Sequence, residues 1–156
     1  MDETLLLRQI PHSVEAEQSV LGAMLIDSRC IPDVVEALTG EDFYLKANRE
    51  IYETIYSMFN FSATIDPVTV LDQMKLTGVY DENTSRSYIL QLMEITPTAA
   101  NVKEYIRIVK DKALLRRISE TAGEMTALVQ EGGETAQTVL DLAEQRIYAI
   151  RQGRNT

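Results

Sequence analysis

The chain has 156 residues, 45% of them hydrophobic and 25% charged, which suits one soluble domain with a buried core. Its formal net charge is −9, whereas a surface that binds nucleic-acid phosphates needs an excess of Lys and Arg, so direct nucleic-acid binding is not expected. No apolar run approaches the roughly 18–20 residues that span a bilayer. Because Met1–Thr4 also lacks the basic start of a signal peptide, we expect a cytoplasmic protein.

Helical signals dominate the first part of the chain. Ser13 is a candidate N-cap, and acidic residues follow it where a helix dipole favours anions. Asp66-Pro67 is a second start signal, because Asp accepts free amides and Pro suits the first helical position. Apolar spacing predicts helices over Val14–Leu25, Cys30–Leu38, Ala47–Asn60, Pro67 to a stop at Gly78, and Ser85 or Arg86 to Ile95.

The segment after Thr96-Pro97 predicts one long helix. From Thr98 or Ala99 to about Gln130 it contains no proline, and its only glycine is Gly123. One apolar stripe recurs at helical spacing through Val102, Ile106, Val109, Ala113, Ile118, Ala122, Met125 and Val129. About 32 residues at a rise of 1.5 Å make a rod of roughly 50 Å, so we expect part of it to project beyond a globular body.

A hairpin follows from the end of that rod. Gly132-Gly133 ends the long helix, and residues 135–152 predict another amphipathic helix. A short break between two such helices is typical of an antiparallel hairpin. We therefore predict an all-α fold, an orthogonal helical bundle with a projecting antiparallel helical hairpin. The predicted organisation is a globular body over 1–97, the hairpin over 98–152, and the start of a linker over 153–156.

The long helix carries a second apolar stripe through Tyr105, Ile108 and Leu115. Two stripes indicate two packing partners. One interpretation is that the first serves the hairpin and the second a dimer interface with another chain. The alternative is that the second stripe packs on the body.

Residue patterns for catalysis are missing from the sequence. None of the seven glycines is followed by Lys, which excludes a phosphate loop ending in Gly-Lys-Ser/Thr. A lone Cys30 and a lone His12 are best interpreted as a small apolar residue and a loop residue. Paired acids such as Glu41-Asp42 lie at turns or helix starts, where acids are common. We expect neither a catalytic site, nor a cofactor site, nor a metal site in this chain.

Four segments carry a resemblance to a known family. The first runs from Pro11 to Gly22 as Pro-His-Ser-Val-Glu-Ala-Glu-Gln-Ser-Val-Leu-Gly. The others are Glu41–Tyr44, Asp66–Val70, and Thr96–Val102 followed by Leu115-Arg116-Arg117. In pattern, order and spacing they resemble the N-terminal domain of DnaB-type bacterial replicative DNA helicases, over nearly the whole chain. Two departures are Asn48, where the family often has His, and residues 60–64, which lack a frequent glycine.

The resemblance implies a non-catalytic collar domain of the helicase that unwinds DNA at the replication fork. It implies that hairpins pair between subunits, that three dimers form the hexamer's collar, and that the C-terminal domain of primase docks there. ATP and Mg²⁺ would belong to a C-terminal ATPase domain outside this chain, so the parent would be the enzyme and this part would not.

By register, the resemblance also implies candidate contacts with primase. They are Glu15, Tyr88, Arg116, Ser119 and Met125. Ser119 and Met125 stand where the family often has larger aliphatic side chains. Tyr88 could instead be core, and Arg116 could instead lie on a solvated helix face. A rival function is a free-standing helical adaptor of replication, which would share the hairpin but lack a downstream Gly-x-x-x-x-Gly-Lys-Thr/Ser loop.

Overall fold

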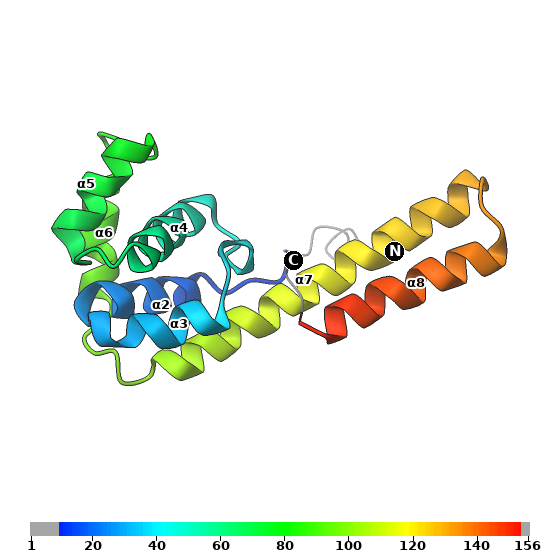
Figure 1. Cartoon of the computed structure of the whole chain (residues 1–156), viewed down its shortest axis with the longest axis horizontal. Coiled ribbons are helices and arrows are strands. Elements are labelled where there is room, and N and C mark those ends of the chain that lie inside the picture. Colours follow the sequence, from blue (N-terminus) through cyan, green and yellow to red (C-terminus); the bar gives the residue numbers. More distant parts are fainter. Residues whose placement is uncertain (1–9, 154–156) are drawn as a thin grey trace, which may run out of the picture. The chain divides into compact units, whose positions relative to one another are not determined.

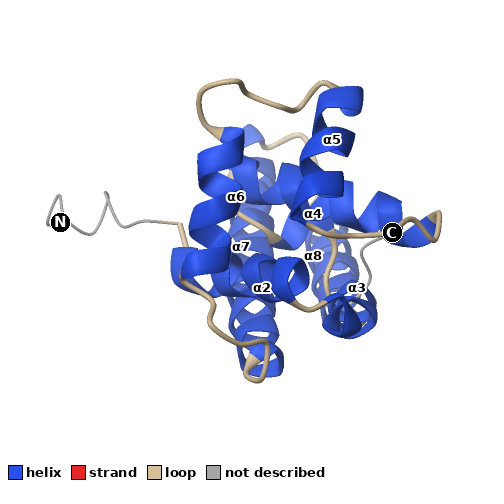
Figure 2. Cartoon of the chain, turned by 90° about the vertical axis from the view of Figure 1, so that its left-hand side faces the viewer, coloured by secondary structure: helices blue, strands red, loops and turns tan. Residues whose placement is uncertain are grey.

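The computed structural model describes residues 10–153, and every regular element in that range is helical, as Figures 1 and 2 show. The all-α prediction is confirmed. The α-helices are α2 (Val14–Ile26), α3 (Ile31–Ala37), α4 (Lys46–Asn60), α5 (Pro67–Thr77), α6 (Ser85–Glu94), α7 (Val102–Glu131) and α8 (Ala136–Arg151), with short 3-10 turns η1 (Ser28–Cys30) and η2 (Gly40–Asp42).

Side-chain caps begin the helices where the sequence predicted them. The Ser13 hydroxyl accepts a hydrogen bond from the Ala16 amide at 3.1 Å, which starts α2. At α5 the Asp66 carboxylate accepts from the Thr69 amide, and the Thr69 hydroxyl accepts from the Asp66 amide, a reciprocal capping box. These bonds satisfy amides that have no partner within their own helix.

Residues with positive φ mark two of the breaks between helices. Gly78 ends α5 in the left-handed conformation, with φ of 80°. Ser62 follows α4 with φ of 55°, the one non-glycine residue of positive φ in the described part of the chain. Ser62 lies in the segment 60–64, which lacks the family's frequent glycine. A positive φ strains residues that have a side chain and does not strain glycine, so glycine suits this position.

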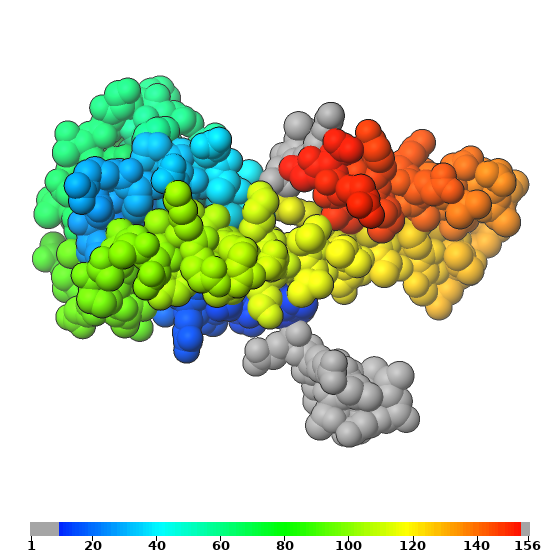
Figure 3. Space-filling model, turned by 90° about the horizontal axis from the view of Figure 1, so that it is seen from below, coloured from blue at the N-terminus to red at the C-terminus, as the bar shows by residue number. Residues whose placement is uncertain are grey.

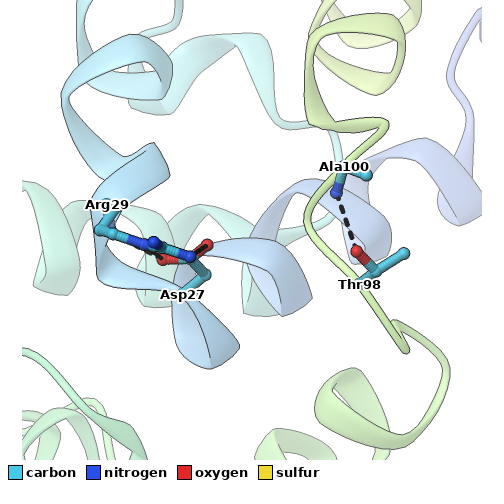
Figure 4. Close-up of polar contacts among 4 residues, drawn as sticks. All are labelled: Asp27, Arg29, Thr98 and Ala100. Carbon is cyan, nitrogen blue, oxygen red and sulfur yellow. Dashed lines mark hydrogen bonds and ion pairs between the residues drawn. The ribbon is translucent and has the colours of Figure 1, made fainter.

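The long helix begins later than predicted, at Val102 instead of Thr98 or Ala99. The Thr98 hydroxyl accepts a hydrogen bond from the Ala100 amide at 3.2 Å, a local turn that competes with the helix (Figure 4). Figure 4 also shows Asp27, which ends α2. Its carboxylate binds the Arg29 guanidinium through two contacts of 2.9 and 3.0 Å. That guanidinium holds the pKa of Asp27 below its usual range.

The chain divides into two compact units, His12–Asp111 and a second that contains Pro11 together with the residues from Lys112 onward. The division falls within α7, beyond the predicted boundary after residue 97. The reason is that the first turns of α7 belong to the body, since Val102, Ile106 and Val109 are buried in its core.

The body's core is a cluster of apolar side chains from α2, α3, α4, α5, α6 and the start of α7. Side-chain hydrogen bonds connect helices at the edge of this core. The Tyr52 hydroxyl donates to the Leu38 carbonyl at 2.6 Å, and the Lys110 ammonium donates to the Ala37 carbonyl at 2.8 Å. Both carbonyls lie at the end of α3, so α4 and α7 each supply a cap to the same short helix.

The second unit contains the hairpin. Figures 1 and 3 show α8 lying along the C-terminal half of α7. An ion pair between Arg146 of α8 and Glu124 of α7 joins the two helices, and Gly132, with φ of 69°, follows the end of α7. The predicted antiparallel hairpin is therefore present.

The closest helix packing in the body centres on Gly22 of α2. A Cβ atom at this position would overlap the Thr96 hydroxyl and the Leu92 carbonyl oxygen, which is backbone and cannot rotate away. We expect Gly22→Ala to lower the free energy of unfolding by roughly 1–3 kcal/mol, because it forces α2 and α6 apart. Gly123→Ala is the matched control, since open space surrounds Gly123 and alanine favours a helix interior by about 1 kcal/mol. Urea unfolding of both variants measures the difference, and equal stabilities would contradict the close packing.

Candidate docking and assembly surfaces

The carboxylate of Glu17 caps a helix other than its own. Glu17 lies in α2 with 1% of its surface exposed, and it accepts hydrogen bonds from the Tyr44 amide at 2.8 Å, the Leu45 amide at 3.3 Å and the Asn48 side-chain amide at 2.9 Å. These donors lie at the start of α4, where free amides and the helix dipole attract an anion. The sequence placed Glu17 only as a first-turn acid of α2, because a capping partner so distant in the chain has no local signature.

Tyr88 extends this polar network to α6. Its hydroxyl donates to the Asn48 carbonyl oxygen and accepts from the Gln18 side-chain amide at 3.3 Å. Burial raises the pKa of the Tyr88 hydroxyl. The hydroxyl of Tyr88 is committed to the interior, while the residue as a whole is only half-buried. Asn48, the departure from the family's frequent His, is the residue that connects Glu17 to Tyr88.

A hollow of about 500 Å³ opens beside the Tyr88 ring. Ile51 and Met74 give it an apolar floor, and Glu50 and Asp81 place carboxylates on its lining. Glu15 is exposed in the first turn of α2, one turn before Gln18 on the same helix face, and Gln18 is the residue of α2 that contacts Tyr88. The surface fits an apolar anchor flanked by basic groups.

The other three predicted docking residues lie on α7 within the second unit. Arg116 is 8% exposed, and its guanidinium donates to the Pro11 carbonyl at 2.8 Å. The alternative that Arg116 lies on a solvated helix face is therefore wrong. Ser119 is exposed and Met125 is half-buried.

The three residues predicted for the dimer interface differ in their surroundings. Tyr105 and Ile108 are half-buried and pack against the body's core. For these two residues the alternative interpretation holds for the buried part of each side chain, which packs on the body. Leu115 is 48% exposed.

Apolar exposure continues along both helices of the hairpin. The large side chains concerned are Leu114, Leu115, Ile118 and Val129 of α7, and Leu140, Ile147 and Tyr148 of α8. Leu114 and Ile118 also line, with Ile147, Ile150 and Arg151, a groove of about 400 Å³ between the helices. The stripe of α8 was predicted to face α7, but no residue of α8 is fully buried. An isolated hairpin is too thin to enclose both stripes.

Among residues 10–153, no group of three or more His, Cys, Asp or Glu side chains is placed to hold a metal ion. Burial raises the pKa of the Cys30 thiol to about 11, which makes it a poor nucleophile. In the same range, no helix is long and apolar enough to cross a membrane.

A family model described as the DnaB-like helicase N terminal domain matches residues 9–111. The chain belongs to this family. The matched range ends where the body ends, at Asp111, so the body is the part that the family model describes.

Curated relatives of this DnaB-like domain extend the match over the hairpin. The chain is 37% identical over 146 residues to a replicative DNA helicase DnaB of Leifsonia xyli, and 34% identical over 159 residues to one of Geobacillus stearothermophilus. These alignments cover 92% and 100% of the chain but only 31% and 34% of the relatives. The chain thus spans about a third of their length.

Solved structures agree with the fold. The N-terminal domain of DnaB helicase from Mycobacterium tuberculosis superposes with a TM-score of 0.83 at 37% identity, covering 90% of this chain and 99% of that one. The N-terminal domain of DnaB helicase from Helicobacter pylori, whose structure was described with its interactions with primase, superposes with a TM-score of 0.64 at 18% identity. This alignment covers 83% of this chain and 99% of that one. At that identity, the second likeness concerns the fold alone.

The buried carboxylate predicts a specific stability effect. We expect Glu17→Gln to lower the free energy of unfolding by about 2 kcal/mol, because the new amide group meets donors that need an acceptor. Glu17→Ala should cost about 3 kcal/mol, since it leaves three donors without their acceptor.

Glu15→Gln is the matched control, because Glu15 is an exposed acid on the same helix and its replacement should change stability by less than about 0.5 kcal/mol. Chemical denaturation followed by circular dichroism measures all three variants. If Glu17→Gln is as stable as Glu15→Gln, the cap does not stabilise the fold.

Proposed function

We propose that this chain is the non-catalytic N-terminal collar domain of a replicative DNA helicase, which assembles the helicase ring and docks primase at the replication fork. The observation that carries this proposal is the family match together with relatives named replicative DNA helicase DnaB, of which the chain covers only about a third. In this proposal unwinding, ATP and Mg²⁺ belong to a domain outside the chain, and the protein works in the cytoplasm.

The exposed apolar surface of the hairpin supports pairing with a second copy. Leu115, Ile118 and Val129 form a stripe along α7 that water contacts in a single chain. Covering it with the hairpin of another copy would complete a four-helix arrangement, which is the usual way for two thin helical hairpins to share a core. Tyr105 and Ile108 would add only the part of their surface that the body leaves free.

A trimer of such dimers needs a second interface, because one two-fold contact closes at two copies. The body offers an apolar surface suited to this. Phe61 is 83% exposed, and Val68 and Leu76 on α5 are each 75% exposed. Leu90 of α6 and Val68 line the same hollow of about 270 Å³. We assign this surface to contacts between dimers in the collar.

Primase docking is supported by the surface around Tyr88. The Helicobacter pylori relative was described with its interactions with primase. In this chain a hollow with apolar and acidic lining residues lies beside the Tyr88 ring. Arg116 is buried, so we propose that it affects docking indirectly, whereas Ser119 and Met125 retain accessible surface on α7.

A free-standing adaptor of replication remains the alternative function. The sequence downstream in the parent reading frame discriminates between the helicase and the adaptor. A Gly-x-x-x-x-Gly-Lys-Thr/Ser loop there supports the helicase, and its absence supports the adaptor.

The docking proposal is tested by calorimetric titration of the chain with the C-terminal domain of the cognate primase. We expect Tyr88→Ala to weaken binding roughly 30-fold, as loss of a central aromatic contact does, and Tyr88→Phe to weaken it much less because the ring remains. Tyr56→Ala is the control, since Tyr56 is a partly exposed aromatic residue of α4 outside the hollow. Equal affinities of the Tyr88→Ala and Tyr56→Ala variants would remove Tyr88 from the docking surface.

The dimer proposal predicts that two substitutions on the second stripe act differently. Leu115→Asp should leave helicity and thermal stability intact and weaken the dimer about 100-fold, because a charge enters the paired apolar surface. Ile108→Asp should lower thermal stability, since Ile108 also packs on the body's core. Lys103→Asp, on an exposed position of α7, controls for the change of charge. Sedimentation equilibrium decides, and an unchanged dimer in Leu115→Asp would contradict the assignment.

A further inference from the structure

The hollow of about 270 Å³ in the body is lined by one face of α5 and one face of α6. Val68, Leu71 and Lys75 line it from α5, and Arg86 and Leu90 line it from α6, in both helices at a spacing that places them on one face. Val68 and Leu90 are 75% and 51% exposed, so the apolar lining is open to water. The volume is below the roughly 300–1,000 Å³ of small-molecule sites, and it suits an apolar side chain of a peptide.

The two cations of this hollow have no carboxylate partner. The Lys75 ammonium lies 4.8 Å from the centre of the Tyr80 ring. In the part of the chain that the structure describes, neither this ammonium nor the Arg86 guanidinium forms an ion pair. Asp72 also lines the hollow, yet it does not pair with Lys75 one turn later. Because acids outnumber bases by 24 to 15 in this chain, the unpaired cations are a local property of this surface.

The position of Arg86 is unfavourable for the helix that carries it. Arg86 is the second residue of α6, and the first turn of this helix contains no acid. The free amides and the dipole at a helix N-terminus favour anions and disfavour a cation. The helix therefore gains no stability from this charge, which indicates that the guanidinium serves a contact outside the chain.

We propose that this hollow binds an acidic amphipathic segment of another protein. An apolar side chain of that segment enters between Val68 and Leu90, and its carboxylates pair with Lys75 and Arg86. Complementary charge selects the sign of the partner. A nucleic acid is a poorer match, because its phosphates require a larger basic surface than two cations on a chain of net charge −9.

The inference goes beyond ring assembly and primase docking, and it does not depend on either. The hollow beside Tyr88 has acidic lining residues and suits the opposite charge. Val68 and Leu90 also belong to the surface assigned to contacts between dimers, whereas Phe61 and Leu76 of that surface do not line the hollow. A bound acidic segment therefore competes with a neighbouring dimer for part of that surface only.

Fluorescence anisotropy with labelled peptides tests the proposal. The acidic probe repeats Glu-Glu-Leu-Phe, which places carboxylates and apolar side chains on opposite faces of a helix, and the basic probe repeats Lys-Lys-Leu-Phe. We expect Arg86→Glu to weaken binding of the acidic probe about tenfold and not to weaken binding of the basic probe. Thermal stability should stay unchanged or rise, because an acid suits the first turn of α6.

Two further variants make the test specific. Lys46→Glu is the matched control, since it makes the same change of charge at an exposed position of α4 outside the hollow, and it should keep the affinity of the unaltered chain. Val68→Ser should also weaken binding of the acidic probe about tenfold, because it removes apolar contact. As Val68 is mostly exposed, the fold tolerates this change.

Three outcomes would overturn the proposal. The first is an acidic probe that does not bind the unaltered chain, or that binds the Arg86→Glu and Lys46→Glu variants equally. The second is displacement of this probe by a single-stranded oligonucleotide as readily as by unlabelled peptide, which would assign the cations to phosphates. The third is an Arg86→Glu variant that retains probe binding but assembles less in sedimentation velocity, which would assign the hollow to another copy of the chain. Primase titration tests the proposed function separately.

Discussion

The carboxylate of Glu17 is a buried anion that connects three helices of the body. It lies in α2, and three donors from the start of α4 surround it. A buried carboxylate is tolerated only where donors replace its lost water, and a helix N-terminus supplies both amides and a favourable dipole. Asn48 in turn accepts a hydrogen bond from the Tyr88 hydroxyl of α6. The relative positions of α2, α4 and α6 therefore depend on a polar network set within an apolar core.

This network limits what the partner-docking residues can do. The Tyr88 hydroxyl is committed to Asn48 and Gln18, so the proposed docking would use the ring and not the polar end of the side chain. Arg116 is similarly committed to Pro11. Both residues are candidate contacts by register, and the fold uses their polar groups itself. In the proposed docking, contact would rely on apolar surface and on the acids around the hollow, which suits a basic amphipathic partner.

The two units differ in how much apolar surface they leave exposed. The body encloses a continuous core, while its α5 side and the hairpin leave large aliphatic and aromatic side chains exposed. Exposed apolar clusters of this kind mark surfaces that associate. The proposed role in assembly would use these surfaces.

Local sequence signals determined the helices: caps at Ser13 and Asp66, the left-handed stop at Gly78 and the break at Gly132 all act within a few residues. The same local patterns predicted the hairpin, and the resemblance predicted the family. Only the tertiary structure decided that Glu17 caps α4, that Arg116 is buried, and that Tyr105 and Ile108 pack partly on the body. Each of these depends on residues far apart in the chain, and a helical stripe shows that a face is apolar without showing what covers it.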